Sequence, residues 1–250
     1  MDLIELKKIK PSSFRRHPWE LARCSVLFFF CKKKVPPQTT IVDVGSGDAF
    51  IARRLARAYP YNTVAAVDVK YTPEIMHEMG GPANLLLYQT LKEAFNASSK
   101  VKCLLLMDVL EHIAEPAKIL QEIRTTPATQ LLPFLFITVP AYPFLFGPHD
   151  VALGHYRRYT RTSLNSLLRK NGFTVLHSGY FFNTLLMVRA AQKFFRLPVH
   201  HQLYNWQGSK WLTQALHCFF YLEFRFAYML SRIGVHIPGL TCYCVAEGKE

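Results

Sequence analysis

The feature that most constrains this chain is the run TIVDVGSGDAF over residues 40–50, in which an apolar, acid-containing segment leads into two closely spaced glycines. Its β-branched residues are typical of a buried parallel strand. Gly45 and Gly47 permit positive φ angles and the close approach of a ligand. Residues 51–58 have the pattern of a helix. We therefore expect a strand, a tight turn and a helix, with a nucleotide-like ligand at the start of that helix.

The same residues have two alternative interpretations, a nicotinamide dinucleotide site and a turn that binds nothing. A nicotinamide dinucleotide would need the fingerprint G-x-G-x-x-G, but Phe50 stands at the last glycine position. The carboxylate of Asp43, beneath the turn, would also not help to bind a diphosphate. The second alternative is an ordinary strand-to-helix turn that binds nothing. The residues therefore weaken the case for a nicotinamide cofactor.

The pattern Asp43-x-Gly45-x-Gly47 resembles the first motif of S-adenosyl-L-methionine-dependent methyltransferases with a Rossmann-like fold. In that family, the acid two residues before the first glycine serves the cationic amino-acid end of the cofactor. A third glycine often follows two residues after the second, and here that position is Ala49. The resemblance implies that Asp43, Gly45, Ser46 and Gly47 bind S-adenosyl-L-methionine.

A second acid fits the same ligand. Residues 63–68 (TVAAVD) predict a strand that ends in Asp68, 23 residues after Gly45. A carboxylate at that strand end lies beside the glycine turn and can accept hydrogen bonds from both ribose hydroxyls of an adenosyl cofactor. The alternative is a cap on the helix that follows. Asp68 thus supports an adenosyl ligand without saying which one.

A third strand end carries the segment DVLEHI over residues 108–113. It resembles the segment after the fourth strand in many small-molecule methyltransferases, including the ubiquinone-biosynthesis O-methyltransferases. The resemblance implies that Asp108 caps a helix and lines the cofactor pocket. For Glu111 and His112 we favour packing or helix-dipole roles, because no second ligand pair lies at metal spacing. We accordingly predict no metal site.

The loop after the fifth predicted strand contains the string HDVALGHYRRY, which resembles the H-D-x-x-x-G-H-x-R-R-Y segment of a bacterial-type branch of methyltransferases. A long loop at the carboxyl end of a parallel strand belongs on the ligand face. His149 or His155 could be the general base and Asp150 could orient it. Arg157 or Arg158 could hold an anionic acceptor. The alternative is a loop in which these side chains are structural.

The whole chain predicts an α/β fold: a doubly wound, mostly parallel seven-stranded sheet with helices on both faces and an antiparallel last strand. Its 250 residues, 50% hydrophobic, suffice for a single core of this size. The expected strands are residues 40–44, 63–68, 84–88, 101–107, 132–139, 173–180 and 240–246. The expected parts are a basic helical extension (1–39), a cofactor-binding core (40–180), a helical aromatic and basic insertion or lid (181–239) and a terminal strand of the core (240–250).

Positive charge is concentrated in the two flanks of the chain. Residues 1–40 carry nine lysines and arginines against three acids, residues 151–250 carry twelve against three, and residues 41–150 carry nine against eleven. Aromatic residues accompany this charge at 28–34 (FFFCKKK) and 219–226 (FFYLEFRF). Such flanks suit an anionic membrane surface, a phosphorylated lipid or a nucleic acid, or they pack on the core as a lid.

The expected location is the cytoplasm, with peripheral membrane association as the most that the apolar segments support. No segment reaches the ~20 apolar residues that a membrane span needs. Acids and lysines precede the first hydrophobic stretch, so a signal-peptide order is missing. Six cysteines without that signal indicate a reducing compartment, and the pair Cys242 and Cys244 lacks partners for a zinc site.

We therefore predict an S-adenosyl-L-methionine-dependent methyltransferase that acts on a small-molecule or lipid-like acceptor. One alternative is an RNA methyltransferase, which the formal charge of +13 favours, although an N-P-P-Y-type amine site and a catalytic cysteine motif are missing. The other is a noncatalytic, adenosyl-binding, membrane-associated protein. That alternative is supported by Ala49 in place of a glycine and by Leu87-Tyr88-Gln89 at the third strand end, where the family often has an acid.

Overall fold

The structure is a computed structural model that describes residues 15–32, 34–98, 100–130, 132, 134–195 and 206–248. Its centre is a seven-stranded sheet with the strand order β3-β2-β1-β4-β5-β7-β6. The strands are β1 (Thr40–Val44), β2 (Thr63–Val67), β3 (Leu85–Tyr88), β4 (Val101–Met107), β5 (Leu135–Pro140), β6 (Phe173–Phe181) and β7 (Thr241–Gly248). Strand β7 runs antiparallel to both β5 and β6, and the pairs from β3 to β5 are parallel.

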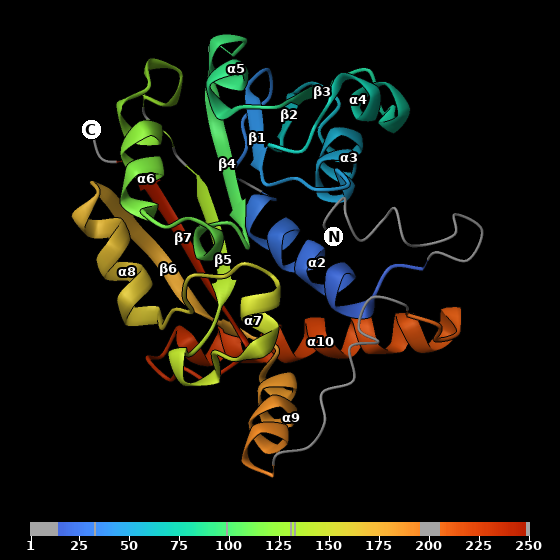
Figure 1. Ribbon diagram of the computed structural model, residues 1–250, viewed down its shortest axis with the longest axis vertical. Helices are drawn as coiled ribbons and strands as arrows, with labels where there is room; N and C mark the ends of the chain where they lie inside the picture. Colours follow the sequence, from blue (N-terminus) through green and yellow to red (C-terminus); the bar gives the residue numbers. More distant parts are fainter. Residues whose placement is uncertain are drawn as a thin grey trace.

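Helices cover both faces of this sheet (Figure 1). One apolar cluster joins the sheet to α5, α6 and α8, and the other joins it to α2, α3 and α10. The helices are α2 (Pro18–Cys31), α3 (Phe50–Ala58), α4 (Pro73–Met79), α5 (Leu91–Asn96), α6 (Pro116–Thr125), α7 (Pro148–Ala152), α8 (Arg161–Lys170), α9 (Asn183–Phe194) and α10 (Lys210–Ser231). The predicted α/β fold with its antiparallel last strand is confirmed.

The alternation of side chains along the strands explains the two layers. In β1, Val42 and Val44 belong to the cluster beneath α5, α6 and α8, whereas Ile41 belongs to the cluster beneath α2, α3 and α10. Leu104 and Leu105 of β4 divide between the clusters in the same way. Successive side chains of a strand point to opposite faces, so uninterrupted apolar runs are needed where both faces are covered.

The strand order indicates at which edge of the sheet a ligand would bind. Strand β1 lies between β2 and β4, so the chain leaves β1 toward one side of the sheet and later returns to its other side. Connections that diverge in this way leave a gap at the carboxyl ends of the two strands, which is where ligands bind in open α/β sheets. The glycine turn after β1 and the segment after β4 both lie at this edge.

Helices α9 and α10 lie between β6 and β7 in the chain and extend along one end of the molecule (Figure 1). The inner face of α10 buries Phe220, Phe224 and Ala227, and it packs against α2 and β6. Among the residues described, no helix is both long and apolar enough to cross a membrane. The predicted division of the chain into four parts stays a prediction.

Phe28, Phe29 and Phe30 are turned toward the protein interior, contrary to an exposed aromatic surface over residues 28–34. The ring of Phe29 meets that of Phe224 edge-on at 5.4 Å, and the ring of Phe30 lies 5.7 Å from that of Phe136. All three phenylalanines are half-buried, because α2 is held between α10 and the sheet. Lys33, part of the same predicted surface, lies outside the described residues.

Candidate active site

The turn after β1 has the conformation that its glycines predict. The φ angle is +67° at Gly45 and +54° at Gly47. A Cβ atom on Gly45 would lie 2.7 Å from Cγ2 of Val109, so a larger residue there would collide with the segment after β4. The Ser46 hydroxyl donates a hydrogen bond to Oδ2 of Asp43 at 2.8 Å. The turn therefore offers an open backbone and a buried acid at the start of α3.

Asp68 fixes the other side of this turn. The Gly47 N–H donates to Oδ2 of Asp68 at 2.9 Å, and the Lys70 N–H donates to Oδ1 at 3.0 Å. Each carboxylate oxygen can accept two hydrogen bonds, so both oxygens of this half-buried side chain keep capacity for ribose hydroxyls. The glycine cradle, the acid below it and the acid beside it match the parts of an adenosyl amino-acid cofactor.

Asp43 is almost completely buried at 3% exposure, and this burial sets its electrostatics. Burial raises the pKa of Asp43 to about 6, against the opposing hydrogen bond from Ser46. The nearby charge of Asp68 also raises the pKa, whereas that of Arg23 lowers it. Among the residues described, Asp43 forms no ion pair, and such a carboxylate suits the ammonium group of an amino-acid ligand.

Asp108 does not cap a helix, so that prediction is wrong. The segment after β4 forms a short 3-10 helix, η2 (Leu110–His112), whose N-cap is Val109 and has no capping side chain. The Asp108 carboxylate instead accepts a hydrogen bond from Thr138 Oγ1 at 2.9 Å and pairs with Arg23 at 2.6 Å. Its φ angle of +55° takes the chain out of the helical region at that point. Lining of the cofactor pocket by Asp108 stays a prediction.

Helix α2 and the residues just before it contribute two arginines that motif spacing does not reveal, Arg23 in the helix and Arg16 ahead of its N-cap. Arg23 pairs with Asp108, and Arg16 pairs with Asp48 in the glycine turn and with Glu20. The Arg16 guanidinium also lies 4.2 Å from the ring centre of Phe50. These contacts hold α2 across the crevice. The only signal in the sequence is the cluster of basic residues that precedes the glycine motif, and it specifies no partners.

The loop after β5 is organised around Asp150, which is 1% exposed. Its Oδ1 accepts hydrogen bonds from His155 Nδ1 at 2.9 Å and Arg158 Nε at 2.8 Å, and its Oδ2 accepts from the Gly147 N–H at 3.0 Å. Burial alone would raise the pKa of Asp150, but the bonds from His155 and Arg158 lower it to about 2. An ionised Asp150 therefore fixes the imidazole of His155 through one nitrogen.

The remaining residues predicted in this loop have different surroundings. His149 is half-buried on α7, beside Asp150 in the sequence. Arg157 donates from Nη2 to the Ala114 carbonyl at 2.6 Å, and its guanidinium lies 5.9 Å from the ring centre of Tyr156. Arg157 thereby ties the loop to the segment after η2. Catalytic roles for His149, Asp150, His155 and Arg157 stay predictions.

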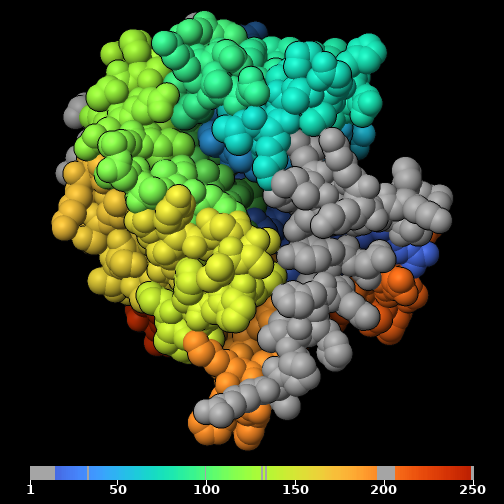
Figure 2. Space-filling model, in the orientation of Figure 1, coloured from blue at the N-terminus to red at the C-terminus, as the bar shows by residue number. Residues whose placement is uncertain are grey.

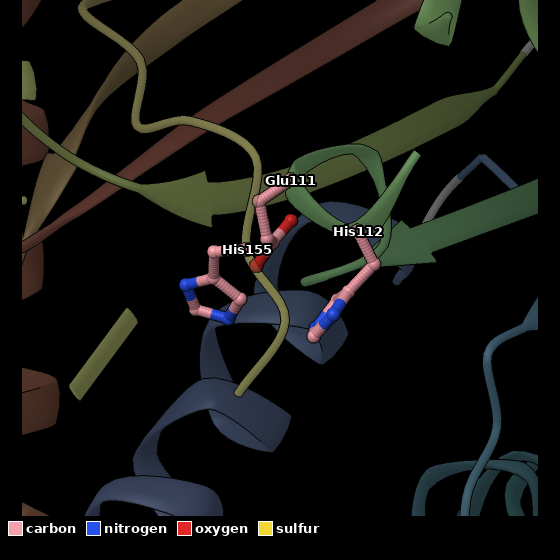
Figure 3. A group of neighbouring side chains, drawn as sticks. All are labelled: Glu111, His112 and His155. Carbon is pink, nitrogen blue, oxygen red and sulfur yellow. The ribbon is translucent and has the colours of Figure 1, made fainter. Parts of the chain in front are cut away.

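Glu111, His112 and His155 form a group in which one possible ligand atom of each side chain lies within 4.8 Å of those of the other two. The Glu111 carboxylate points toward the two rings, which approach edge-on at 4.6 Å (Figure 3). Neither carboxylate oxygen has a hydrogen-bond partner among the residues described. Burial raises the pKa of Glu111 well above its ordinary value, and the nearby charge of Asp108 adds to this. The sequence favours packing roles for Glu111 and His112, and it does not predict this grouping.

The profile of the methyltransferase domain family matches residues 14–178, about two-thirds of the chain. The chain belongs to this family. It is an enzyme, and its cofactor is S-adenosylmethionine, as the glycine motif and the two acids predict. The closer resemblance to the ubiquinone-biosynthesis enzymes stays a prediction.

Solved structures share the fold of this methyltransferase at low sequence identity. A chain of the complex between the Haloferax volcanii Trm112 methyltransferase activator and a methyltransferase is 16% identical, with a TM-score of 0.54 and coverage of 92% of this chain and 95% of that chain. A sarcosine dimethylglycine methyltransferase from Galdieria sulphuraria is 12% identical, with a TM-score of 0.54 and coverage of 92% and 84%. The [4+2]-cyclase SpnF is 16% identical, with a TM-score of 0.54 and coverage of 93% and 83%. Among curated proteins, the comparison found no significant match.

These likenesses establish the fold of the methyltransferase but not its acceptor. The matched proteins have different reactions in their names, and one of them is a cyclase. A shared fold therefore leaves the substrate open, and the acceptor has to be argued from the surfaces of this chain.

Asp68→Ala should weaken the binding of S-adenosylhomocysteine by roughly ten- to a hundredfold. A hydrogen bond to a charged acceptor contributes about 1.5–3 kcal/mol to the binding free energy. Gly45→Val should abolish binding, since the added side chain meets Val109 and the φ angle is positive. Calorimetric titration measures both. Glu78→Ala, at an exposed acid on α4, is the matched control and should bind normally. Unchanged affinity in Asp68→Ala would remove Asp68 from the site.

The affinity for S-adenosylhomocysteine should fall about tenfold from pH 7 to pH 5. Asp43 has a raised pKa of about 6, so its charge is lost as the pH falls through that value. A protonated Asp43 no longer attracts the ammonium group of the ligand. Asp43→Asn should bind more weakly at pH 7 and show little change between the two pH values. An affinity that is independent of pH in the unaltered protein would exclude this role for Asp43.

Proposed function

We propose that this methyltransferase transfers a methyl group to a small-molecule or lipid-like acceptor at a membrane surface. The observation that carries the proposal is an apolar cavity of about 470 Å³ between the loop after β5 and α9. Its lining residues are Phe144, Leu145, Ala190, Ala191, Lys193, Phe194 and Phe195. Apolar walls with a single cationic side chain suit an acceptor that has a hydrophobic body and a polar or anionic end.

The two sides of this cavity come from segments that lie side by side on one face of the protein (Figure 2). The Lys193 ammonium donates a hydrogen bond to the Phe144 carbonyl, which joins α9 to the short 3-10 helix η4 (Pro143–Leu145). The same loop continues into α7 and His155. A hydrophobic acceptor bound at α9 would therefore lie against the loop that carries the predicted catalytic residues.

The proposed chemistry requires the chain to position two reactants and to remove a proton. When bound, S-adenosylmethionine supplies an activated methyl group for an in-line displacement. Asp43, Gly45 and Asp68 would hold the cofactor at the carboxyl edge of the sheet. Asp150 orients the His155 imidazole through Nδ1, so Nε2 is left to face the acceptor. We place the deprotonation of the acceptor at His155 for this reason.

A membrane surface is supported by the outer face of α10. Exposed apolar residues follow one another at helical spacing along this face and into the turn beyond it: Phe219, Leu222, Phe226 and Met229 of α10, then Ile233. Arg225 and Arg232 flank the stripe and are also exposed. Because the opposite face of α10 is buried against α2 and β6, the exposed stripe is not needed for the core. Apolar stripes rimmed by basic residues are typical of helices that lie in a membrane interface.

Neither alternative function has comparable support. An RNA methyltransferase would use the positive charge, but exposed aliphatic side chains add nothing to phosphate binding. A noncatalytic protein is suggested by Ala49 in place of a glycine, yet Ala49 adopts φ +54°, the left-handed conformation that a glycine would provide there. The turn is therefore formed despite the substitution.

His155→Ala should lower turnover by about 10² to 10⁴ while the affinity for S-adenosylhomocysteine is nearly unchanged. Turnover is measured as S-adenosylhomocysteine release with a panel of phenolic and lipid-like acceptors. His149→Ala is the comparison, since the sequence leaves both histidines open as the base. Equal losses of cofactor binding and turnover in the two variants would show that the loop is structural. A protein that is noncatalytic would have no turnover to lose.

The protein should sediment with vesicles that contain anionic lipid, and added salt should weaken this binding without abolishing it. Burial of apolar side chains is insensitive to screening, whereas each arginine near the surface contributes about 1 kcal/mol. The triple variant Leu222→Ser, Phe226→Ser, Met229→Ser should lose the salt-resistant part. Arg225→Gln with Arg232→Gln should lose the salt-sensitive part. No vesicle binding at low salt, together with tight RNA binding that collapses steeply with salt, would favour an RNA methyltransferase instead.

A further inference from the structure

We propose that Glu111, His112 and His155 bind a divalent transition-metal ion at the acceptor side of the cofactor site. The Glu111 carboxylate and the His112 imidazole come from η2, and the His155 imidazole comes from the loop after β5. One ligand atom of each residue lies within 4.8 Å of those of the other two. Neighbouring ligands of one such ion lie about 3.0–3.6 Å apart when the bonds are ~2.2 Å, so the three side chains would have to draw together by up to about 1.5 Å on binding. Imidazole with carboxylate is a donor set that suits Mn²⁺, Fe²⁺ and Zn²⁺.

The buried Glu111 carboxylate supplies the strongest evidence that a ligand belongs there. It is 1% exposed, and both oxygens are without a hydrogen-bond partner among the residues described. The two neighbouring arginines are bound to other acids, because Arg23 pairs with Asp108 and Arg158 with Asp150. A buried carboxylate normally has a paired cation or coordinates a metal. A metal ion between Glu111 and the two imidazoles would satisfy it.

Asp150 prepares His155 for such an ion. Its carboxylate accepts the hydrogen bond from Nδ1 of His155 at 2.9 Å, so Nε2 is the nitrogen left to coordinate. Histidines that ligate metals almost always bond a carboxylate or carbonyl through the other ring nitrogen, which fixes both the tautomer and the ring orientation. The same carboxylate is held in turn by Arg158 Nε at 2.8 Å. Glu111, His112 and His155 thus have both the donors and the outer support of a metal site.

Glu111, His112 and His155 lie close to the glycine turn that is proposed to hold the cofactor, so an ion bound there could take part in methyl transfer. Val109, two residues before Glu111, contacts the glycine turn, since a Cβ on Gly45 would lie 2.7 Å from its Cγ2. Three protein ligands leave coordination positions open for an oxygen of the acceptor. This orienting role rests on the proposed function, whereas binding of the ion does not. With the ion bound, His155 would be a ligand rather than the base. The ion would lower the pKa of a bound acceptor hydroxyl, whose proton would then pass to water.

Mn²⁺ alone is the probe, because thiolates compete little for it and its free and bound forms differ in electron paramagnetic resonance. The chain is first stripped with a chelator and then titrated without cofactor or acceptor. We expect one Mn²⁺ per chain. Glu111→Gln, which keeps the shape of the buried side chain, and His112→Gln, at an exposed residue, should each weaken binding at least about tenfold. His77→Gln, at an exposed histidine on α4, is the control and should bind like the unaltered protein.

Binding that is absent, or that is equal in Glu111→Gln and the unaltered protein, would overturn the proposal. Thermal melting of each variant shows whether it is folded, and His112→Gln repeats the test at a side chain outside the core. Full turnover by the chelator-stripped enzyme would overturn the orienting role and leave His155 as a simple base. Mn²⁺ binding without turnover on any acceptor would contradict the proposed function and still support the metal site.

Discussion

The backbone turn after β1 is the constraint on which the site depends. Gly45, Gly47 and Ala49 all take positive φ angles, a conformation that is costly for a residue with a Cβ, and Ala49 alone carries one. The turn is held from both sides: the Gly47 N–H bonds to Asp68 beyond β2, and Gly45 lies against Val109 beyond β4. Three strand ends are therefore fixed relative to one another by one turn.

Helix α2 couples the N-terminal part of the chain to this turn through charge. Arg16 reaches Asp48 in the turn and Arg23 reaches Asp108 beyond β4. Water screens the attraction within these partly buried pairs less than at the surface, but removing the charges from water also costs free energy. The helix also packs its apolar residues between α10 and the sheet. Helix α2 is therefore held beside the turn by both charge and apolar packing.

The two faces of α10 have different surroundings. Phe220 and Phe224 complete the core, whereas the stripe from Phe219 to Ile233 is exposed on the opposite side. A helix that only covered a core would gain nothing from the second stripe. The same end of the molecule carries α9 and the apolar cavity at the loop after β5. The proposed acceptor cavity and the exposed stripe therefore lie in one region of the protein.

The sequence by itself determined the sheet, the glycine turn and the two acids beside it. Apolar runs, positive-φ residues and the ends of parallel strands are local signals, and parallel strands bring their carboxyl ends to one edge whatever the loops do. For the same reason Asp43, Gly47 and Asp68 could be assigned to one site. The capping role of Asp108 could not, because Thr138 and Arg23 compete for its carboxylate from distant parts of the chain.

Only the tertiary structure decided which polar side chains share a buried space. His155 lies 43 residues beyond His112, and no periodicity relates them. Their approach to Glu111 depends on how the loop after β5 folds back over η2, which the Arg157 bond to Ala114 helps to fix. The inward packing of Phe29 and the outward stripe of α10 were likewise settled by long-range contacts. Burial is a property of the whole packed chain, so a helical pattern with apolar residues on two faces cannot specify which face meets the core.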